Sequence, residues 1–206
     1  RTPFLVQAGQ SPRGYAFGCK HAEALFVIFQ NVAKATEGVQ RVRALEAEFG
    51  RTPDSIKLMQ GISVVTAETE RELKLKVERY KIEGLLSLFG GWTGIDLAGF
   101  KPGDVISSFE SDNMKHLAAF FGEIDPAQTW TFADMCEWMK LAAISPVVIG
   151  TPTQVADQLE HWMDKGGVDG FNLIPVIQPG TLADFVDLVV PELQQRGRMR
   201  TAYPEQ

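Results

Sequence analysis

The chain has 206 residues, of which 45% are hydrophobic and 22% are charged, and its formal net charge is −6. This balance argues against the clustered basic surface that nucleic acids and anionic membranes require, and no apolar run has the length of a bilayer-spanning segment. The two cysteines, Cys19 and Cys136, belong to no metal-ligand or redox motif, so we expect a reduced, cytoplasmic chain without a metal site.

The beginning of the chain alternates short apolar runs with a helical segment. Residues 3–8 and 24–29 are apolar and partly β-branched, which is typical of buried strands. Between them, Ser11 and Pro12 are the residue types favoured at a helix N-cap and in the first helical turn, so we expect a short helix from there to about residue 21. A strand–helix–strand unit with such short connections predicts a parallel sheet.

The same alternation continues and then breaks. The pattern predicts a long helix over about 32–49 that Gly50 ends, a strand over 56–65 and a charged helix over 68–80. Residues from about 81 to 146 hold glycine-rich and proline-containing segments and three of the tryptophans, and they lose the rhythm. We interpret this stretch as an insertion.

The alternation returns near the end of the chain. Thr151 and Gln154 have capping-box spacing, residues 170–177 read as a strand, and Thr181 is expected to cap a final helix. The predicted strands number about four, whereas a TIM barrel has eight strands and roughly 250 residues. We therefore predict an α/β fold in which residues 1–206 form a single partial domain, half a barrel with an insertion. Because its edges are open, we expect the chain alone to be poorly folded or to associate.

The turn after the first strand is the best candidate site. Gly9, Gln10 and Ser11 lead into a helix N-terminus, where unpaired backbone N–H groups and the positive end of the helix dipole can hold a phosphate. From the residues alone, a plain helix cap is the commoner explanation of this pattern.

Three further residues are candidates for a substrate pocket. Asn172 interrupts an apolar strand, and it either points into the barrel mouth or bonds to a neighbouring loop. Phe171 and Trp92 have the aromatic character to line a pocket for a ring-shaped molecule, although core packing is the usual role of such residues.

Several segments together resemble one enzyme family. They match, in order, flavin-dependent monooxygenases of the luciferase-like superfamily, in the branch of the nitrilotriacetate, dibenzothiophene-sulfone and alkane monooxygenases. The segments are QAGQSPRG (7–14), HAEALF (21–26), GWTGIDL (91–97), GTPTQVAD (150–157), DGFNL (169–173) and DFVDLVVPEL (184–193).

The resemblance implies the C-terminal half of a luciferase-like TIM barrel in an FMN-dependent monooxygenase. A separate flavin reductase would supply reduced FMN, which reacts with O2 to oxygenate a small organic substrate. The FMN phosphate would lie at the turn formed by Ala8, Gly9, Gln10 and Ser11, held by backbone N–H groups and the Ser11 hydroxyl, although Gln10 stands where the family usually has serine. No catalytic residue can be assigned, because the family's reacting-site groups lie mainly in the other half. We expect a homo-oligomer, and no activity from this chain alone.

Two alternatives stay open. A split or degenerate barrel half could act without catalysis, through dimerisation. A deazaflavin-dependent oxidoreductase of the wider superfamily is the other, and the GWTGIDL segment favours the FMN branch over it by resemblance.

Overall fold

The computed structural model describes residues 3–84, 101, 103–108, 112–139, 141 and 145–202. The chain divides into two compact units, one formed by Arg1–Lys76 with Ile144–Gln206 and the other by Val77–Ala143. The predicted insertion over about 81–146 overlaps the second unit, and its status as an insertion stays a prediction.

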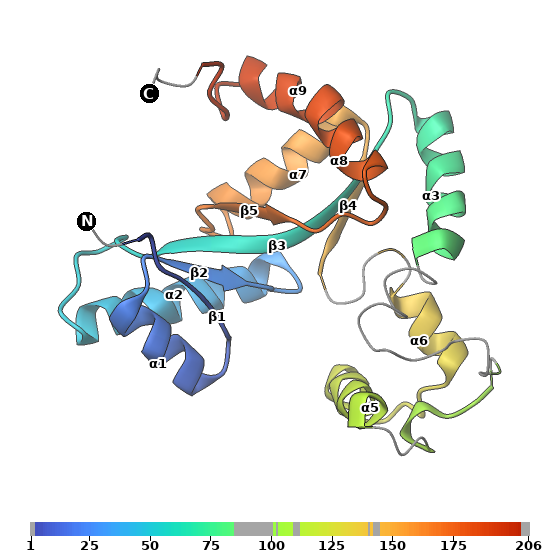
Figure 1. The fold of residues 1–206 in the computed structure, drawn as a ribbon, viewed down its shortest axis with the longest axis horizontal. Coiled ribbons are helices and arrows are strands. Elements are labelled where there is room, and N and C mark those ends of the chain that lie inside the picture. Colours follow the sequence, from blue (N-terminus) through green and yellow to red (C-terminus); the bar gives the residue numbers. More distant parts are fainter. Residues whose placement is uncertain are drawn as a thin grey trace. The chain divides into compact units, whose positions relative to one another are not determined.

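The first unit contains a parallel sheet (Figure 1). Its strands are β1 (Val6–Ala8), β2 (Ala24–Val27), β3 (Lys57–Thr66), β4 (Val147–Gly150) and β5 (Gly170–Leu173). The long strand β3 is the centre of the sheet, because it pairs in parallel with β2, β4 and β5, while β1 pairs with β2.

The hydrogen bonds of β3 show on which side each neighbour lies. The amides of Lys57 and Ser63 donate to carbonyls just before β2 and β4, whereas the carbonyl of Ile62 accepts from Ile174, just after β5. Successive residues of a strand direct their backbone groups to opposite edges, so β2 and β4 share one edge of β3 and β5 takes the other. Across the sheet the strands therefore follow the order β1, β2, β3, β5, which is also their order along the chain, as in a (β/α) barrel. Strand β4 pairs with the same edge of β3 as β2 does, closer to the carboxyl end of β3.

Helices connect the strands as the alternating pattern predicts. They are α1 (Pro12–His21), α2 (Val32–Glu48), α3 (Glu70–Gly84), α5 (Asp112–Ile124), α6 (Phe132–Met139), α7 (Pro152–Asp164), α8 (Gly180–Asp184) and α9 (Val190–Gln195), with a 3-10 turn at Ile106–Ser108 and a π-helical turn at Phe185–Val189. Among the described helices, none combines the length and apolar character needed to cross a membrane.

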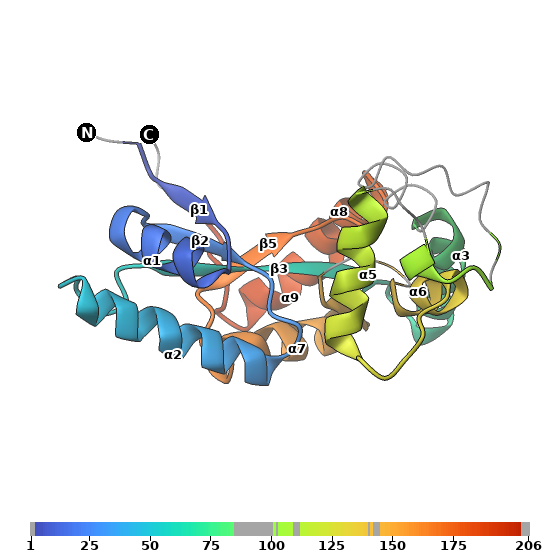
Figure 2. The ribbon, with the colours of Figure 1, turned by 90° about the horizontal axis from the view of Figure 1, so that it is seen from below.

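One face of the sheet is covered by helices and holds the core. Figure 2 shows α2 and α7 on the same side of β3. Leu25 and Ile62 from the strands pack in one buried cluster with Cys19 and Trp162 from the helices. Helix α1 approaches so closely that a Cβ atom at Gly18 would lie 2.5 Å from Leu25 Cδ2.

In the described part of the chain, the opposite face of the sheet is covered along the later residues of β3, where Ser63 and Val65 are buried, but it is open at the outer strands β1 and β5. There, β1 pairs with β2 alone and β5 with β3 alone. Phe4 and Val6 are 65% and 59% exposed, and Asn172 on β5 is also exposed. Exposed apolar side chains on a parallel sheet, which is normally buried on both faces, indicate a partial barrel.

Three details differ from the sequence-based expectations. The described residues contain five strands rather than four, because β4 forms immediately before α7. Strand β5 ends at Leu173 instead of residue 177, since Pro175 has no N–H to continue the ladder. Thr181 lies inside α8, which begins at Gly180, and its hydroxyl donates to the carbonyl of Ile177 at 2.9 Å.

The second unit has an aromatic core. The ring of Phe121 lies 4.8 Å from that of Trp130 and 5.3 Å from that of Trp138, measured between centroids. Met114 and Met135, from α5 and α6, are also buried in this unit.

Candidate functional site

The turn between β1 and α1 has the geometry of an anion-binding helix start. Gly9 has φ +142°, and Ser11 follows as the N-cap of α1, where its Oγ accepts from the amide of Gly14 at 3.0 Å. The Ser11 carbonyl accepts from Tyr15 N at 2.9 Å. Ser11 is exposed, and its hydroxyl retains a proton to donate, since its oxygen is the acceptor in the cap. The first-turn amides of a helix lack intrahelical partners, so they too can bind a ligand.

The charge near this turn also favours an anion. The first turn of α1 contains no acidic residue, and the exposed Arg13 lies in it. The positive end of the helix dipole and the guanidinium group both lower the energy of a nearby phosphate. The turn follows the carboxyl end of β1, the end at which ligands bind in barrels of this type.

Gly14 keeps the turn tight. A Cβ atom at this position would lie 2.9 Å from the Gly9 carbonyl oxygen and 3.1 Å from Ser11 Oγ. The chain therefore folds back on the helix so closely that a side chain does not fit without moving the backbone.

Gln10 is placed differently from its neighbours. Its Oε1 accepts from the amide of Ile28 at 2.7 Å, and its Nε2 donates to the hydroxyl of Tyr15 at 3.2 Å. Both ends of the side-chain amide are thus engaged with the protein, and Gln10 offers a ligand its backbone N–H. The geometry of the turn is compatible with a phosphate site at Gly9, Gln10 and Ser11, and their role in such a site stays a prediction.

A second glutamine, which the sequence did not single out, shapes the end of β2. Gln60 is fully buried, and its side chain accepts from Phe29 N at 3.0 Å and donates to Phe29 O at 3.1 Å. Two glutamine amides therefore hold the backbone of Ile28 and Phe29 beside the β1–α1 turn. The sequence did contain a signal for this role, because Gln60 is a polar residue within the apolar run of β3.

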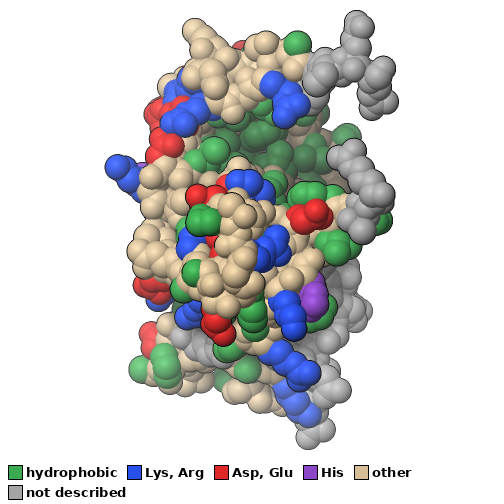
Figure 3. Space-filling model, turned by 90° about the vertical axis from the view of Figure 1, so that its left-hand side faces the viewer, with side chains coloured by type: hydrophobic (Ala, Val, Ile, Leu, Met, Phe, Trp, Pro, Cys, Tyr) green, Lys and Arg blue, Asp and Glu red, His purple; other side chains and the backbone are tan. Residues whose placement is uncertain are grey.

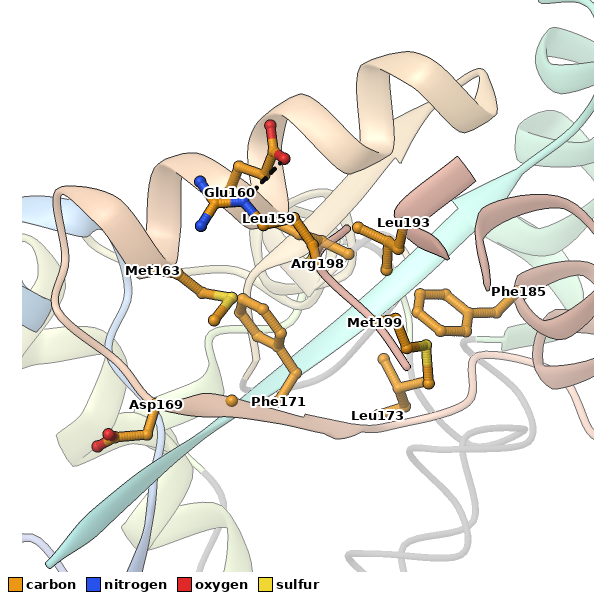
Figure 4. Close-up of a pocket in the computed structure, with 11 residues that line it drawn as sticks. Leu159, Glu160, Met163, Asp169, Phe171, Leu173, Phe185, Leu193, Arg198 and Met199 are labelled. Carbon is orange, nitrogen blue, oxygen red and sulfur yellow. Dashed lines mark hydrogen bonds and ion pairs between the residues drawn. The ribbon is translucent and has the colours of Figure 1, made fainter. Parts of the chain in front are cut away.

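Two of the three substrate-pocket candidates, Phe171 and Asn172, lie on opposite faces of β5. Phe171 and Leu173 point to the helix side, where they line an apolar cavity of about 290 Å³ with Met163, Leu193 and Met199 (Figure 4). Seen from the side on which both chain ends lie, hydrophobic side chains gather in a hollow (Figure 3).

Asn172 points the other way, toward the exposed face of the sheet, because side chains alternate along a strand. Trp92 lies outside the described residues. The roles of all three in a substrate pocket stay predictions.

A buried carboxylate that the sequence analysis missed lies at the amino end of β3, opposite to the turn. Glu46 is 1% exposed and accepts from Ile56 N at 2.7 Å, Arg43 Nη1 at 3.1 Å and Ser55 Oγ at 3.2 Å. Burial alone would raise its pKa, but the hydrogen bonds from Ile56, Arg43 and Ser55 outweigh it and hold the pKa of Glu46 below its usual value. This cluster fixes the α2–β3 connection.

Two other groups have structural roles. Burial raises the pKa of the Cys19 thiol, which disfavours the reactive thiolate and agrees with its place in the core. Arg196 binds Asp157 at 2.6 Å, Glu160 at 3.0 Å and Glu192 at 2.8 Å. It thereby fastens the end of α9 to α7.

Comparisons with known proteins agree with the resemblance seen in the sequence. Residues 1–170 match the family model described as luciferase-like monooxygenase. The chain is 37% identical to dimethyl-sulfide monooxygenase of Hyphomicrobium sulfonivorans over 98% of its own length and 43% of that protein. It is 32% identical to nitrilotriacetate monooxygenase component A of Aminobacter aminovorans over 98% and 46%, respectively.

Solved structures extend the comparison to the fold. A crystal structure of riboflavin lyase, described with modified FMN and riboflavin, matches with a TM-score of 0.72 at 32% identity, covering 99% of this chain and 45% of that one. The chain thus spans less than half the length of each of these three relatives, and its sheet is part of a luciferase-like TIM barrel. The chain belongs to the luciferase-like monooxygenase family.

Proposed function

We propose that this chain is part of an FMN-dependent monooxygenase that oxygenates a small organic substrate with O2, using reduced FMN from a separate flavin reductase. The observation that carries the proposal is the β1–α1 turn, an exposed N-capped helix start without acidic residues at the carboxyl end of a barrel strand. The membership of the family supports it, as do the FMN of the riboflavin lyase structure and the "component A" of the nitrilotriacetate relative.

The residues of the turn fit a phosphate monoester. The backbone N–H groups of Gly9, Gln10 and Ser11 and the Ser11 hydroxyl would bind the phosphate oxygens, with Ala8 ending the strand before them. Arg13 adds a positive charge nearby. When bound, the flavin supplies the electrons that activate O2. The turn itself binds and orients the cofactor, and the exposed amide of Asn172 is available for a polar group of the substrate.

The rest of the barrel must come from elsewhere in the assembly. We propose that a complete enzyme contains further strands that pair with the free edges of β1 and β5, and that these strands carry the catalytic residues. We also propose that this enzyme is a homo-oligomer. Trp92 remains a candidate for its substrate pocket beside Asn172, whereas Phe171 remains a candidate only for a pocket on the helix side of β5.

The phosphate site is tested with a pair of N-cap variants. Ser11→Ala removes the proposed phosphate contact and the cap of α1, whereas Thr69→Ala removes the equivalent cap of α3, where Thr69 Oγ1 accepts from Glu72 N at 3.3 Å. The affinities for FMN and for riboflavin, which lacks the phosphate, are measured by flavin fluorescence. We expect Ser11→Ala to weaken FMN binding by about 1–2 kcal/mol and to leave riboflavin binding unchanged.

These titrations are carried out on both the 206-residue chain and the complete enzyme. Thr69→Ala should lower stability by about 1 kcal/mol without changing the FMN-to-riboflavin affinity ratio. An unsubstituted complete enzyme that binds both flavins equally, or neither, would refute the phosphate site.

A further inference from the structure

The side chain of Gln10 extends the hydrogen-bond ladder between β1 and β2. Ala24 N donates to Leu5 O, and Phe26 is paired with Ala8, the last residue of β1. Ile28 comes two residues after Phe26, so its amide faces the same edge, beyond the end of β1. Gln10 Oε1 accepts from this amide at 2.7 Å, in the place of the next strand carbonyl.

The other end of the amide reaches α1. Gln10 Nε2 lies 3.2 Å from the hydroxyl of Tyr15, which is 3% exposed and packs in the core cluster. Because Ile28 N–H requires an acceptor, the oxygen of the amide must face β2 and the nitrogen must face Tyr15. One short side chain thus ties the turn to the end of a strand and to the buried side of the following helix.

These two bonds act on the same backbone that would hold the phosphate. Gln10 lies between Gly9, with its φ of +142°, and the N-cap Ser11. Fixing its side chain at both ends restricts the directions in which the N–H groups of the turn point. Binding groups that are held in place before the ligand arrives lose less conformational entropy on binding.

We propose that Gln10 is a positioning residue of the phosphate site: its side-chain amide locks the β1–α1 turn against Ile28 and Tyr15 and does not itself bind the phosphate. The inference rests on the function proposed above, since it concerns the same site. Serine at this position would offer a hydroxyl but would be too short to reach Ile28 in the same way.

The test compares variants in whichever form of the protein binds FMN. Gln10→Met keeps the length of the side chain and removes both hydrogen bonds, and Gln10→Ser replaces the amide by a hydroxyl. Gln40→Met, on the exposed face of α2, is the matched control. Tyr15→Phe is a milder variant that keeps the buried ring and removes one bond. The readout is the ratio of FMN to riboflavin affinity, together with the unfolding midpoint.

We expect Gln10→Met and Gln10→Ser to weaken FMN binding roughly tenfold with riboflavin affinity unchanged, and Tyr15→Phe to lower the ratio by a smaller factor. Gln40→Met should change nothing. An equal loss of both flavins would mean a purely structural role and would overturn the proposal. Unchanged FMN affinity in Gln10→Ser would instead mean that the side chain at this position binds the phosphate directly and that a serine hydroxyl can replace it. This result would also overturn the proposal. Absence of FMN preference in the unsubstituted protein would refute the phosphate site itself, so the two failures are distinguishable.

Discussion

Replacing Gly14 by alanine tests how tightly the β1–α1 turn is built. The new Cβ would lie 2.9 Å from the Gly9 carbonyl oxygen, an atom of the backbone that cannot rotate away. Alanine gains up to about 1 kcal/mol over glycine within a helix, but the steric conflict costs about 1–3 kcal/mol, so we expect a net loss of about 1 kcal/mol. Because relief of the contact must move Gly9 or Ser11, FMN affinity should fall about tenfold while riboflavin affinity stays constant.

A second helical glycine provides the control. A Cβ atom at Gly122, in α5, would meet no atom within 4 Å. Gly122→Ala should therefore stabilise its helix by up to about 1 kcal/mol and leave flavin binding unchanged. The assays are urea unfolding followed by circular dichroism and flavin titration by fluorescence. If Gly14→Ala is as stable as Gly122→Ala and binds FMN normally, the turn is not constrained as described.

Two further predictions concern the framework. Glu46→Gln should lower the free energy of unfolding by about 2 kcal/mol at pH 7, because it weakens the buried bonds to Arg43 and Ile56. The pKa of Glu46 is lower in the folded chain than in the unfolded one, so its contribution to stability is present above the unfolded pKa and is lost as the pH falls through the folded pKa. The difference in unfolding free energy between the parent chain and Glu46→Gln should therefore shrink below about pH 4. A constant difference down to about pH 2 would contradict this. Arg196→Met should destabilise the packing of α9 on α7 by about 1–2 kcal/mol, measured by hydrogen exchange in α9, because it breaks three ion pairs, of which Asp157 accepts the shortest. Exchange unchanged from the parent chain would show that this network adds nothing.

Local sequence signals predicted the elements well wherever they depend on neighbouring residues. Ser11 and Pro12 mark the start of α1, and Asn31 caps α2 at the start that the pattern predicts. Gly50 and Gly167, both with positive φ, likewise lie just after the ends of α2 and α7. These signals succeed because a cap or a turn is decided within about four residues.

Features that depend on distant partners were beyond local patterns. Strand β4 is four residues long and forms because Ser63 N bonds to the carbonyl of Pro146, far along the chain. From the sequence, the side chain of Gln10 could equally face a ligand; only the structure shows that it bonds to the amide of Ile28. Glu46 did leave a signal, since it falls on the buried face of α2 four residues after Val42.

The most direct test of the proposed site follows the backbone amides themselves. FMN and riboflavin are titrated separately into the 15N-labelled protein, and the amide shifts are recorded by NMR. The account predicts that the amides of Gly9, Gln10 and Ser11 shift strongly with FMN and little with riboflavin, and that Gln10→Met reduces this difference. Equal shifts with both flavins, or shifts confined to other elements, would contradict a phosphate site at the β1–α1 turn.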